Sequence, residues 1–146
     1  MTEAAPRGAE VVYRHCPAVT NAELNALFAL AWPQHTWRDF QPVLRRSLAY
    51  IGAYTTDRTV DRLIGFINLA WDGGLHAFVL DTTVHPALRR RGIGRQLVRQ
   101  AVAAARAHGV EWVHVDFEAP LRGFYRQCGF RPTAAGLLQV RPSSHP

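Results

Sequence analysis

The stretch that decides the fold is residues 81–101, which read DTTVHPALRRRGIGRQLVRQA. A β-branched, apolar run ends at Pro86, arginines and glycines follow, and an apolar-periodic segment begins after Gly94. This order predicts a strand, a tight loop and the start of a helix. Backbone N–H groups at a helix N-terminus attract anions, and glycine lets the backbone approach a phosphate closely. The stretch therefore predicts a site for a phosphate-bearing ligand.

The bulk properties are those of a globular protein. A chain of 146 residues suits one domain, which we expect over residues 10–140, with tails at 1–9 and 141–146. No apolar run has the ~18 residues of a membrane span, and the first residues lack the apolar core of a signal peptide. The default prediction is a cytoplasmic protein without a membrane partner. Neither the two cysteines nor the seven histidines have metal-ligand spacing, so no metal is expected.

The charge is carried in an unusual way. All 17 basic residues are arginines, and the net charge is +6. The lack of lysine excludes a lysine Schiff base and a P-loop lysine. Positive charge is compatible with a small nucleic-acid-binding protein, which would spread arginines along one face and bind DNA or RNA in a salt-sensitive way. Here five arginines cluster in the loop and the segment after it, which favours local anion binding and no nucleic-acid partner: Arg89, Arg90, Arg91, Arg95 and Arg99.

The remaining elements predict a mixed α+β fold, with the sheet partly antiparallel and partly parallel. Thr20 and Glu23 fit a capping box, Asp72 begins a hairpin signal, and residues 55–61 read as a polar turn. The predicted order is β-α-α-β-β-β-α-β-α-β. Strands are expected at 10–16, 48–54, 63–70, 75–84 and 110–117, with one or two pieces at 130–140, and helices at 21–31, 42–47, from Gly94 to Gly109 as the C′ residue, and 121–128.

Two motifs in this context resemble a known family. Arg89-x-x-Gly92-x-Gly94 lies between a predicted strand and a predicted helix, and Phe124-Tyr125-x-x-x-Gly129-Phe130 follows about 30 residues later. They resemble the pyrophosphate loop (Gln/Arg-x-x-Gly-x-Gly/Ala) and the closing helix of the GNAT superfamily of N-acetyltransferases. The element order matches over residues 11–140. The resemblance implies the GNAT fold, a central mixed, mostly antiparallel sheet flanked by helices, with a splayed parallel strand pair for CoA.

This resemblance implies transfer of an acetyl group from acetyl-CoA to a primary amine of a small molecule or peptide by direct attack. The pantetheine arm would pair with the backbone of Thr82, Thr83 and Val84 by strand addition. A backbone N–H there would polarise the thioester carbonyl. The pyrophosphate would lie on the loop and the helix start, formed by Arg89, Arg90, Arg91, Gly92, Ile93, Gly94 and Arg95.

The acid and base of the reaction are expected among a few polar side chains. Tyr125 matches the family tyrosine that gives a proton or a hydrogen bond to the departing sulfur, although without its flanking pattern it would read as a packed aromatic. Candidate bases for the amine are Asp81, His114, Asp116 and Glu118, each of which could instead have a structural role. Histidine needs the least tuning to act near neutral pH.

The acceptor pocket is expected in the first half of the chain. Trp32 and Trp37 are the leading wall candidates, and His35, Trp71 and His76 are further ones; aromatic side chains suit a flat or cationic substrate. Asp116 and Glu118 would suit a cationic amine. Glu118 stands where family members often have asparagine, and Pro120 where they have alanine, so the strand-to-helix connection is expected to differ locally. An antibiotic, a polyamine, an amino acid and a protein N-terminus all stay open as acceptors.

Two further alternatives stay open at this stage. A protein of the same fold could bind acyl-CoA without catalysis, although Tyr125 and the polar strand residues favour an enzyme. Dimers are common in the superfamily, so a homodimer is compatible with the sequence.

Overall fold

The computed structural model of the chain describes residues 10–57 and 60–142. The chain divides into two compact units, residues 1–115 (unit 1) and 116–146 (unit 2). The predicted tail at 1–9 and most of the predicted tail at 141–146 lie outside the described residues.

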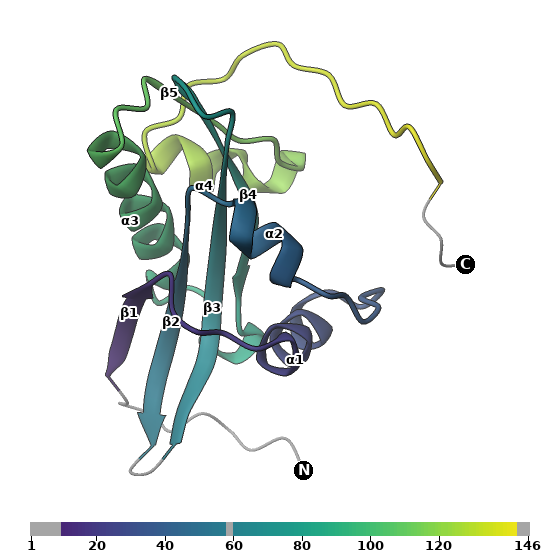
Figure 1. The fold of residues 1–146 in the computed structure, drawn as a ribbon, viewed down its shortest axis with the longest axis vertical. Helices are drawn as coiled ribbons and strands as arrows, with labels where there is room; N and C mark the ends of the chain where they lie inside the picture. The colour runs from purple at the N-terminus through teal and green to yellow at the C-terminus, as the bar shows by residue number, and fades with distance from the viewer. Residues whose placement is uncertain (1–9, 58–59, 143–146) are drawn as a thin grey trace. The chain divides into compact units, whose positions relative to one another are not determined.

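Unit 1 is built on a five-stranded sheet in the order β1-β2-β3-β4-β5 (Figure 1). Its strands are β1 (Val11–His15), β2 (Ala49–Asp57), β3 (Val60–Trp71), β4 (His76–Val84) and β5 (Trp112–His114). The first three pairings are antiparallel, and β4 with β5 is parallel. The predicted mixed and mostly antiparallel sheet is confirmed.

Helices cover both faces of this sheet. They are α1 (Asn21–Ala31), α2 (Gln41–Arg46) and α3 (Ile93–Ala107). A Cβ on Gly65 of β3 would meet Leu97 and Ile93 of α3, whereas the ring of the next residue, Phe66, lies 6.1 Å from that of Phe28 in α1. Successive strand residues point to opposite faces. The α3 face and the α1 face are therefore the two sides of the sheet in unit 1.

The start of α1 is fixed by a capping box, as the sequence predicts. The Thr20 hydroxyl accepts the backbone N–H of Glu23 at 3.1 Å, and the Glu23 carboxylate accepts the backbone N–H of Thr20 at 2.8 Å. Leu24, Leu27 and Phe28 then fall on the buried side of the helix. The box satisfies two N–H groups that the helix itself leaves unpaired, so it anchors the first turn.

Replacing Thr20 with alanine is expected to destabilise the protein by about 1 kcal/mol, because one helix-end N–H loses its acceptor. Denaturant unfolding measures the change in free energy. Thr133→Ala is the matched control, since Thr133 is exposed and outside any helix or strand. Equal stability of the two variants would show that the cap contributes nothing.

Helix α3 is bounded by two glycines in left-handed conformations. Gly92 is the N-cap with φ 81°, and Gly109 follows the C-cap with φ 75°. The N–H of Val110 donates to the carbonyl of Ala105, and the N–H of Gly109 to that of Arg106, each at 3.1 Å. This pair of bonds is the Schellman motif, which confirms Gly109 as the predicted C′ residue.

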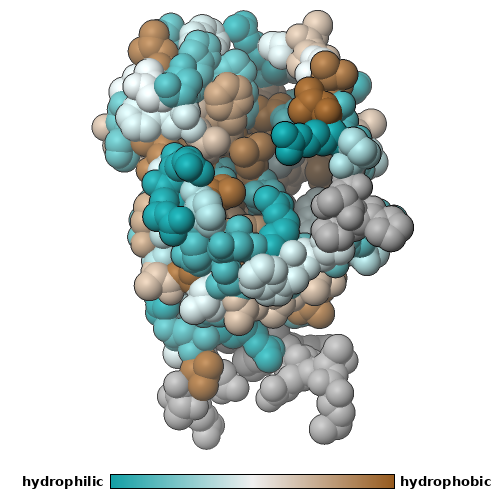
Figure 2. Space-filling model, turned by 45° about the vertical axis from the view of Figure 1, so that its right-hand side comes forward, coloured by the Kyte–Doolittle hydropathy of each residue, from teal (hydrophilic) through white to brown (hydrophobic). Residues whose placement is uncertain are grey.

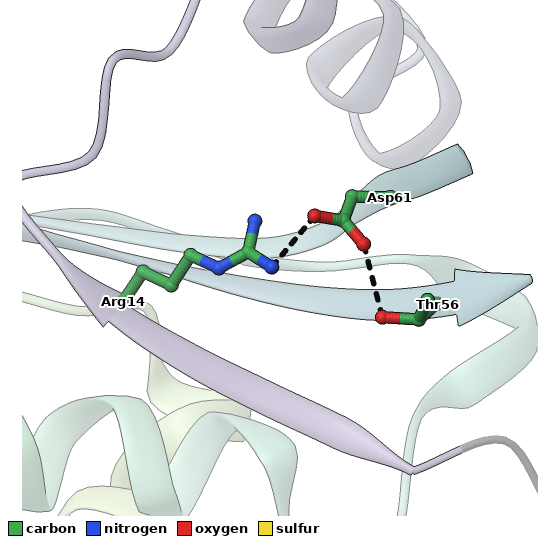
Figure 3. A network of polar contacts seen from close by, with 3 residues as sticks. All are labelled: Arg14, Thr56 and Asp61. Atoms are coloured by element: carbon green, nitrogen blue, oxygen red, sulfur yellow. Dashed lines mark hydrogen bonds and ion pairs between the residues drawn. The ribbon is translucent and has the colours of Figure 1, made fainter. Parts of the chain in front are cut away.

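The predicted polar turn at residues 55–61 is too long, because residues 55–57 belong to β2 and residues 60–61 to β3, while residues 58–59 lie outside the described residues. Thr56 of β2 lies opposite Asp61 of β3 in the ladder, and its hydroxyl donates to the Asp61 carboxylate at 3.0 Å. Arg14 of β1 pairs with the same carboxylate at 2.6 Å (Figure 3). The Arg14 hydrogen bond, followed by that of Thr56, lowers the pKa of Asp61. The polar residues that suggest a turn in the sequence, Thr56 and Asp61, are therefore an exposed cross-strand pair.

Unit 2 contains a 3-10 turn, η2 (Ala119–Leu121), and helix α4 (Arg122–Gln127). The predicted strand at 110–117 is reduced to β5, and the described residues after Gly129 form neither helix nor strand, so the predicted strand pieces at 130–140 are wrong. Pro132 has no N–H to give to a ladder, and Gly136 disfavours extended pairing. Leu137, Leu138 and Val140 are more than 80% exposed, so no burial stabilises a strand there.

Candidate functional site

The centre of the candidate site in unit 1 is the fork at which β4 and β5 stop pairing. The parallel ladder has three pairs, the last of them Phe78 with His114. Strand β4 continues to Val84, six residues beyond this pair. The residues expected to hold the pantetheine arm lie on this stretch of β4, which pairs with β3 but not with β5.

A β-bulge lies on the same stretch. Phe66 of β3 pairs with Thr83, and Asn68 pairs with Leu80, so Asp81 and Thr82 together oppose one residue of β3. Asp81 has φ 58°, which non-glycine residues rarely adopt. Bulges interrupt the regular ladder and turn backbone groups in new directions, and they occur often beside active sites.

The side chain of Trp32, the C-cap of α1, reaches β4 at the bulge. The indole Nε1 of Trp32 donates to the hydroxyl of Thr83 at 3.3 Å, and this hydroxyl donates to the carbonyl of Asp81 at 3.0 Å. Thr83 is buried. The neighbouring Thr82 hydroxyl is a buried atom with no hydrogen-bond partner among the described residues. A buried hydroxyl in this state is open to a polar ligand group that lies along the strand.

The carboxyl of Asp81 has an altered acidity. Burial raises the pKa of Asp81 above its ordinary value, and the nearby Arg38 opposes this with a smaller effect. A carboxyl with a raised pKa is a stronger base once it is ionised, which supports Asp81 as one of the predicted base candidates.

The stability of Asp81→Asn relative to the wild type is expected to be greater at neutral pH than at acid pH. Asparagine tolerates the positive φ of this position, so the substitution adds little backbone strain. Below the ordinary carboxyl pKa, the aspartate is protonated in both the folded and the unfolded chain. As the pH rises through the raised folded pKa, the unfolded chain ionises more readily, so the wild type loses stability that Asp81→Asn keeps. Thermal unfolding at acid and neutral pH measures the difference.

Asp72→Asn is the control of opposite sign for this measurement. Hydrogen bonding by the backbone N–H of Gly74 is the first of the effects that lower the pKa of Asp72. The stability of Asp72→Asn relative to the wild type should therefore fall as the pH rises. A pH-independent difference between Asp81→Asn and wild type would contradict the raised pKa.

The loop after β4 leads directly into helix α3. A 3-10 turn, η1 (Pro86–Leu88), is followed by Arg90 with φ 63° and Gly92 with φ 81°. Neighbouring residues of opposite φ form concave sets of N–H groups, and α3 begins at the next residue. Arg89, Arg90 and Arg91 are exposed. The predicted loop and helix start are confirmed as structural elements, while the ligand stays a prediction.

His114 is held at the fork by two neighbours. Its ring stacks on Phe78, with centroids 4.8 Å apart, and its Nε2 lies 2.7 Å from Nδ1 of His76. His114 is exposed, and Phe78 and Leu80 on β4 are 38% and 40% exposed. Figure 2 shows hydrophobic patches set among hydrophilic surface on the face it draws. The fork thus combines a basic imidazole with accessible apolar surface.

The other predicted wall residues are not all brought together. Trp37 is exposed, and His35 bonds to the Asn25 side chain at 2.8 Å. Burial, followed by the charge of Arg38, lowers the pKa of His35. Trp71 donates to the carbonyl of Gly74 and packs edge-on against His108, next to the end of α3. Among the five predicted wall residues, two contact residues of the candidate site. Trp32 bonds to Thr83, and His76 bonds to His114.

In unit 2, Tyr125 lies among aromatic rings. It is buried, stacks on Phe117 at 4.9 Å, and makes edge contacts with Phe124 and Phe130. The Phe-Tyr-x-x-x-Gly-Phe pattern therefore forms a packed cluster around this tyrosine. Asp116 and Glu118 are both exposed in the same unit.

Two features of the site have no clear signal in the sequence. The bulge at Asp81 and Thr82 depends on the register with β3, and the contact of His76 with His114 depends on the register of two strands 38 residues apart in sequence. A polar residue inside an apolar strand run is the one available hint of the bulge.

The family model of the acetyltransferase (GNAT) family matches residues 19–130, more than half of the chain. This protein belongs to the GNAT family. Serotonin N-acetyltransferase 2 of Oryza sativa subsp. japonica is 29% identical to this GNAT protein over 130 residues, which are 88% of this chain and 64% of the rice protein. The chain spans less than two thirds of the length of the curated relatives that match it first.

Solved structures share the fold of this GNAT protein. A GNAT-family protein of Streptococcus pneumoniae TIGR4 superimposes with a TM-score of 0.75 at 24% identity, over 90% of this chain and 98% of that one. The aminoglycoside N-acetyltransferase AAC(6')-Iy in complex with CoA gives 0.69 at 18% identity, over 94% and 98%. The predicted GNAT fold is confirmed.

The described part of the GNAT chain contains neither a membrane-spanning helix nor a cluster of possible metal ligands. None of its helices has the length and apolar character needed to cross a membrane. Within residues 10–57 and 60–142, no group of three or more histidine, cysteine, aspartate and glutamate side chains could hold a metal ion.

Proposed function

We propose that this GNAT protein is an acetyl-CoA-dependent N-acetyltransferase that acts on a primary amine of a small molecule or peptide, within one domain over residues 10–140. The observation that carries the proposal is the fork between β4 and β5, with a bulge on β4 and a glycine-containing loop that opens α3. In the proposed complex, this arrangement would give acetyl-CoA an extended backbone edge and a loop for its phosphates on consecutive elements.

The residues present fit acetyl-CoA. The Thr82 hydroxyl is buried without a partner among the described residues, and a Cβ on Gly92 would meet nothing within 4 Å, so the space before the loop backbone is open. Thr82, Thr83 and Val84 would hold the pantetheine arm, and the loop Arg89–Arg95 the pyrophosphate. When bound, acetyl-CoA supplies an acyl thioester; a backbone N–H at the bulge would polarise its carbonyl.

His114 is our assignment for the base that removes a proton from the amine. It is exposed at the fork, where an amine has access, and its ring is oriented by Phe78 and His76. Asp81 is the competing assignment, supported by its raised pKa and its place in the bulge. An alkyl ammonium has no free lone pair, so a base has to take its proton before attack.

Tyr125 is our assignment for the acid that gives a proton to the departing sulfur. Its match to the closing motif and its fixed ring, held by Phe117, Phe124 and Phe130, support this role. A phenol is a workable proton source for a thiolate. No covalent enzyme intermediate is needed, since the amine attacks the thioester directly.

The acceptor is proposed at the level of its functional group. The matched relatives are named for serotonin and aminoglycoside N-acetylation, two chemically different amines. We propose that Trp32 and Trp37 contribute to the acceptor wall, and that Asp116 and Glu118 attract a cationic amine.

Replacing Gly92 with valine is expected to weaken acetyl-CoA binding by about tenfold or more, which is about 1.4 kcal/mol. A β-branched residue strains a φ of 81° and puts a side chain in the open space where the phosphate approaches. Isothermal titration calorimetry with acetyl-CoA measures the change in Kd.

The matched control is Gly109→Val at the other end of α3. Gly109 has φ 75° and equally open space around its Cβ position, so it takes the same backbone strain. Its variant should unfold more easily but bind acetyl-CoA as the wild type does. Equal affinities for the two variants would contradict the assignment of the loop.

Calorimetric titrations of the wild type with acetyl-CoA and with a short DNA duplex test the proposed function at its first step. Binding of acetyl-CoA without salt-sensitive DNA binding supports it. Absence of acetyl-CoA binding would contradict both the enzyme and the alternative, a non-catalytic acyl-CoA-binding module. Salt-sensitive DNA binding alone would assign the arginine cluster to nucleic acid.

A further inference from the structure

Two histidines from different strands form a hydrogen-bonded pair at the fork. His76 is the first residue of β4, and His114 is the last residue of β5. Nδ1 of His76 lies 2.7 Å from Nε2 of His114, and the ring centroids are 5.0 Å apart. Phe78 stacks on the ring of His114, and this contact together with the hydrogen bond to His76 orients the ring.

The short distance between the two nitrogens couples the protonation of the two rings. A hydrogen bond holds a single proton, so one nitrogen donates and the other accepts. For Nδ1 of His114 to accept a proton from an amine, its Nε2 has to carry the hydrogen and donate to His76. His76 then accepts at Nδ1 and carries its own hydrogen at Nε2.

We propose that His76 is a positioning and relay residue that fixes the reactive tautomer of His114 and passes the amine proton to solvent. The proposal rests on the proposed function. The N–H bond of the ammonium breaks as an Nδ1–H bond forms on His114. The Nε2–H bond of His114 breaks as an Nδ1–H bond forms on His76, and the Nε2 proton of His76 leaves to water. One proton moves from amine to solvent, and both rings are left with hydrogen at Nδ1. The pair returns to its starting tautomer when Nε2 of His76 takes a proton from water, the Nδ1 proton of His76 passes back to Nε2 of His114, and the Nδ1 proton of His114 leaves to water. Nothing is oxidised or reduced.

His76 lies beside the carboxylate of Asp72. The backbone N–H of His76 donates to the carboxylate of Asp72 at 3.2 Å, and the charge of His76 is one of the effects that lower the pKa of Asp72, after the N–H of Gly74. His76 is half-buried at the hairpin end of β4.

NMR of the resting protein labelled with ¹⁵N-histidine tests the tautomers without any substrate. We expect the neutral pair to carry hydrogen at Nε2 of both rings, with Nδ1 of His76 as the acceptor. A hydrogen on Nδ1 of His76 would overturn the proposal, because Nε2 of His114 would then be the acceptor and its Nδ1 could not take a proton.

Activity of His76→Gln tests the relay itself. Glutamine can still accept a hydrogen bond from His114 but cannot pass a proton on. In dilute buffer we expect kcat to fall about tenfold with an unchanged KM for acetyl-CoA, and added imidazole to restore it. His108→Gln, which removes a histidine bonded to the carbonyl of Ala104, is the control and should behave as wild type.

The outcomes separate the relay from the proposed function. A loss in His76→Gln that does not respond to imidazole, or no loss at all, would overturn the relay while wild-type turnover upholds the enzyme. A wild-type protein that releases no thiol with any amine would overturn the enzyme, and the relay with it.

Discussion

Replacing His114 with glutamine is expected to lower kcat/KM for an alkyl amine by about 10²- to 10⁴-fold at neutral pH. The imidazole at the fork is the proposed acceptor of the amine proton, and glutamine has no comparable basicity. The loss should shrink as the pH approaches the ordinary pKa of an alkyl ammonium, about 10, because the amine then needs no base. Steady-state rates across pH measure both effects.

The control for this substitution is His15→Gln. His15 is an exposed histidine on β1 that bonds to the Gln100 side chain at 2.8 Å. His15→Gln therefore makes the same chemical change as His114→Gln, away from the fork. Its activity should match the wild type. If Asp81→Asn showed the pH-dependent loss and His114→Gln did not, the base would be Asp81.

Replacing Tyr125 with phenylalanine is expected to lower kcat by about 10²-fold or more while the Kd for acetyl-CoA stays unchanged. The ring is retained, so the packing on Phe117, Phe124 and Phe130 should survive. Only the hydroxyl that would protonate the sulfur is removed. Turnover and calorimetric affinity, measured on the same preparation, separate the two quantities.

Tyr54→Phe is the matched control for the loss of a buried hydroxyl. Tyr54 is buried on β2, and burial is the first cause that raises its pKa. Its variant should keep wild-type kcat. An unaltered rate in Tyr125→Phe, or an equal loss in both variants, would remove Tyr125 as the acid.

Local signals explain which elements the sequence predicts well. The capping box at Thr20 fixes the start of α1, and Pro33 follows its end at the C-cap Trp32. Gly92 and Gly109 mark the two ends of α3 because their positive φ angles favour glycine. Among the elements of the candidate site, such signals predict the loop between β4 and α3 and the strand β4 before it.

Nonlocal pairing explains what the sequence does not predict. The segment after Gly129 has strand-like residues but no ladder partner among the described residues, and Leu137 stays 88% exposed. The polar residues Thr56 and Asp61 suggest a turn, yet they pair across two strands. The contact of His76 with His114 follows from strand register, which composition and periodicity do not encode.

The most direct test of the central claim is release of free thiol from acetyl-CoA in the presence of a broad panel of amines. The thiols of Cys16 and Cys128 form no disulfide and give a constant background that an amine-free control subtracts. An acetyl-CoA-dependent N-acetyltransferase should release thiol at a rate that rises with the concentration of at least one primary amine, and should yield the acetylated amine in equal amount. Acetyl-CoA binding with no amine-dependent release across the panel would contradict catalysis and identify a binding module.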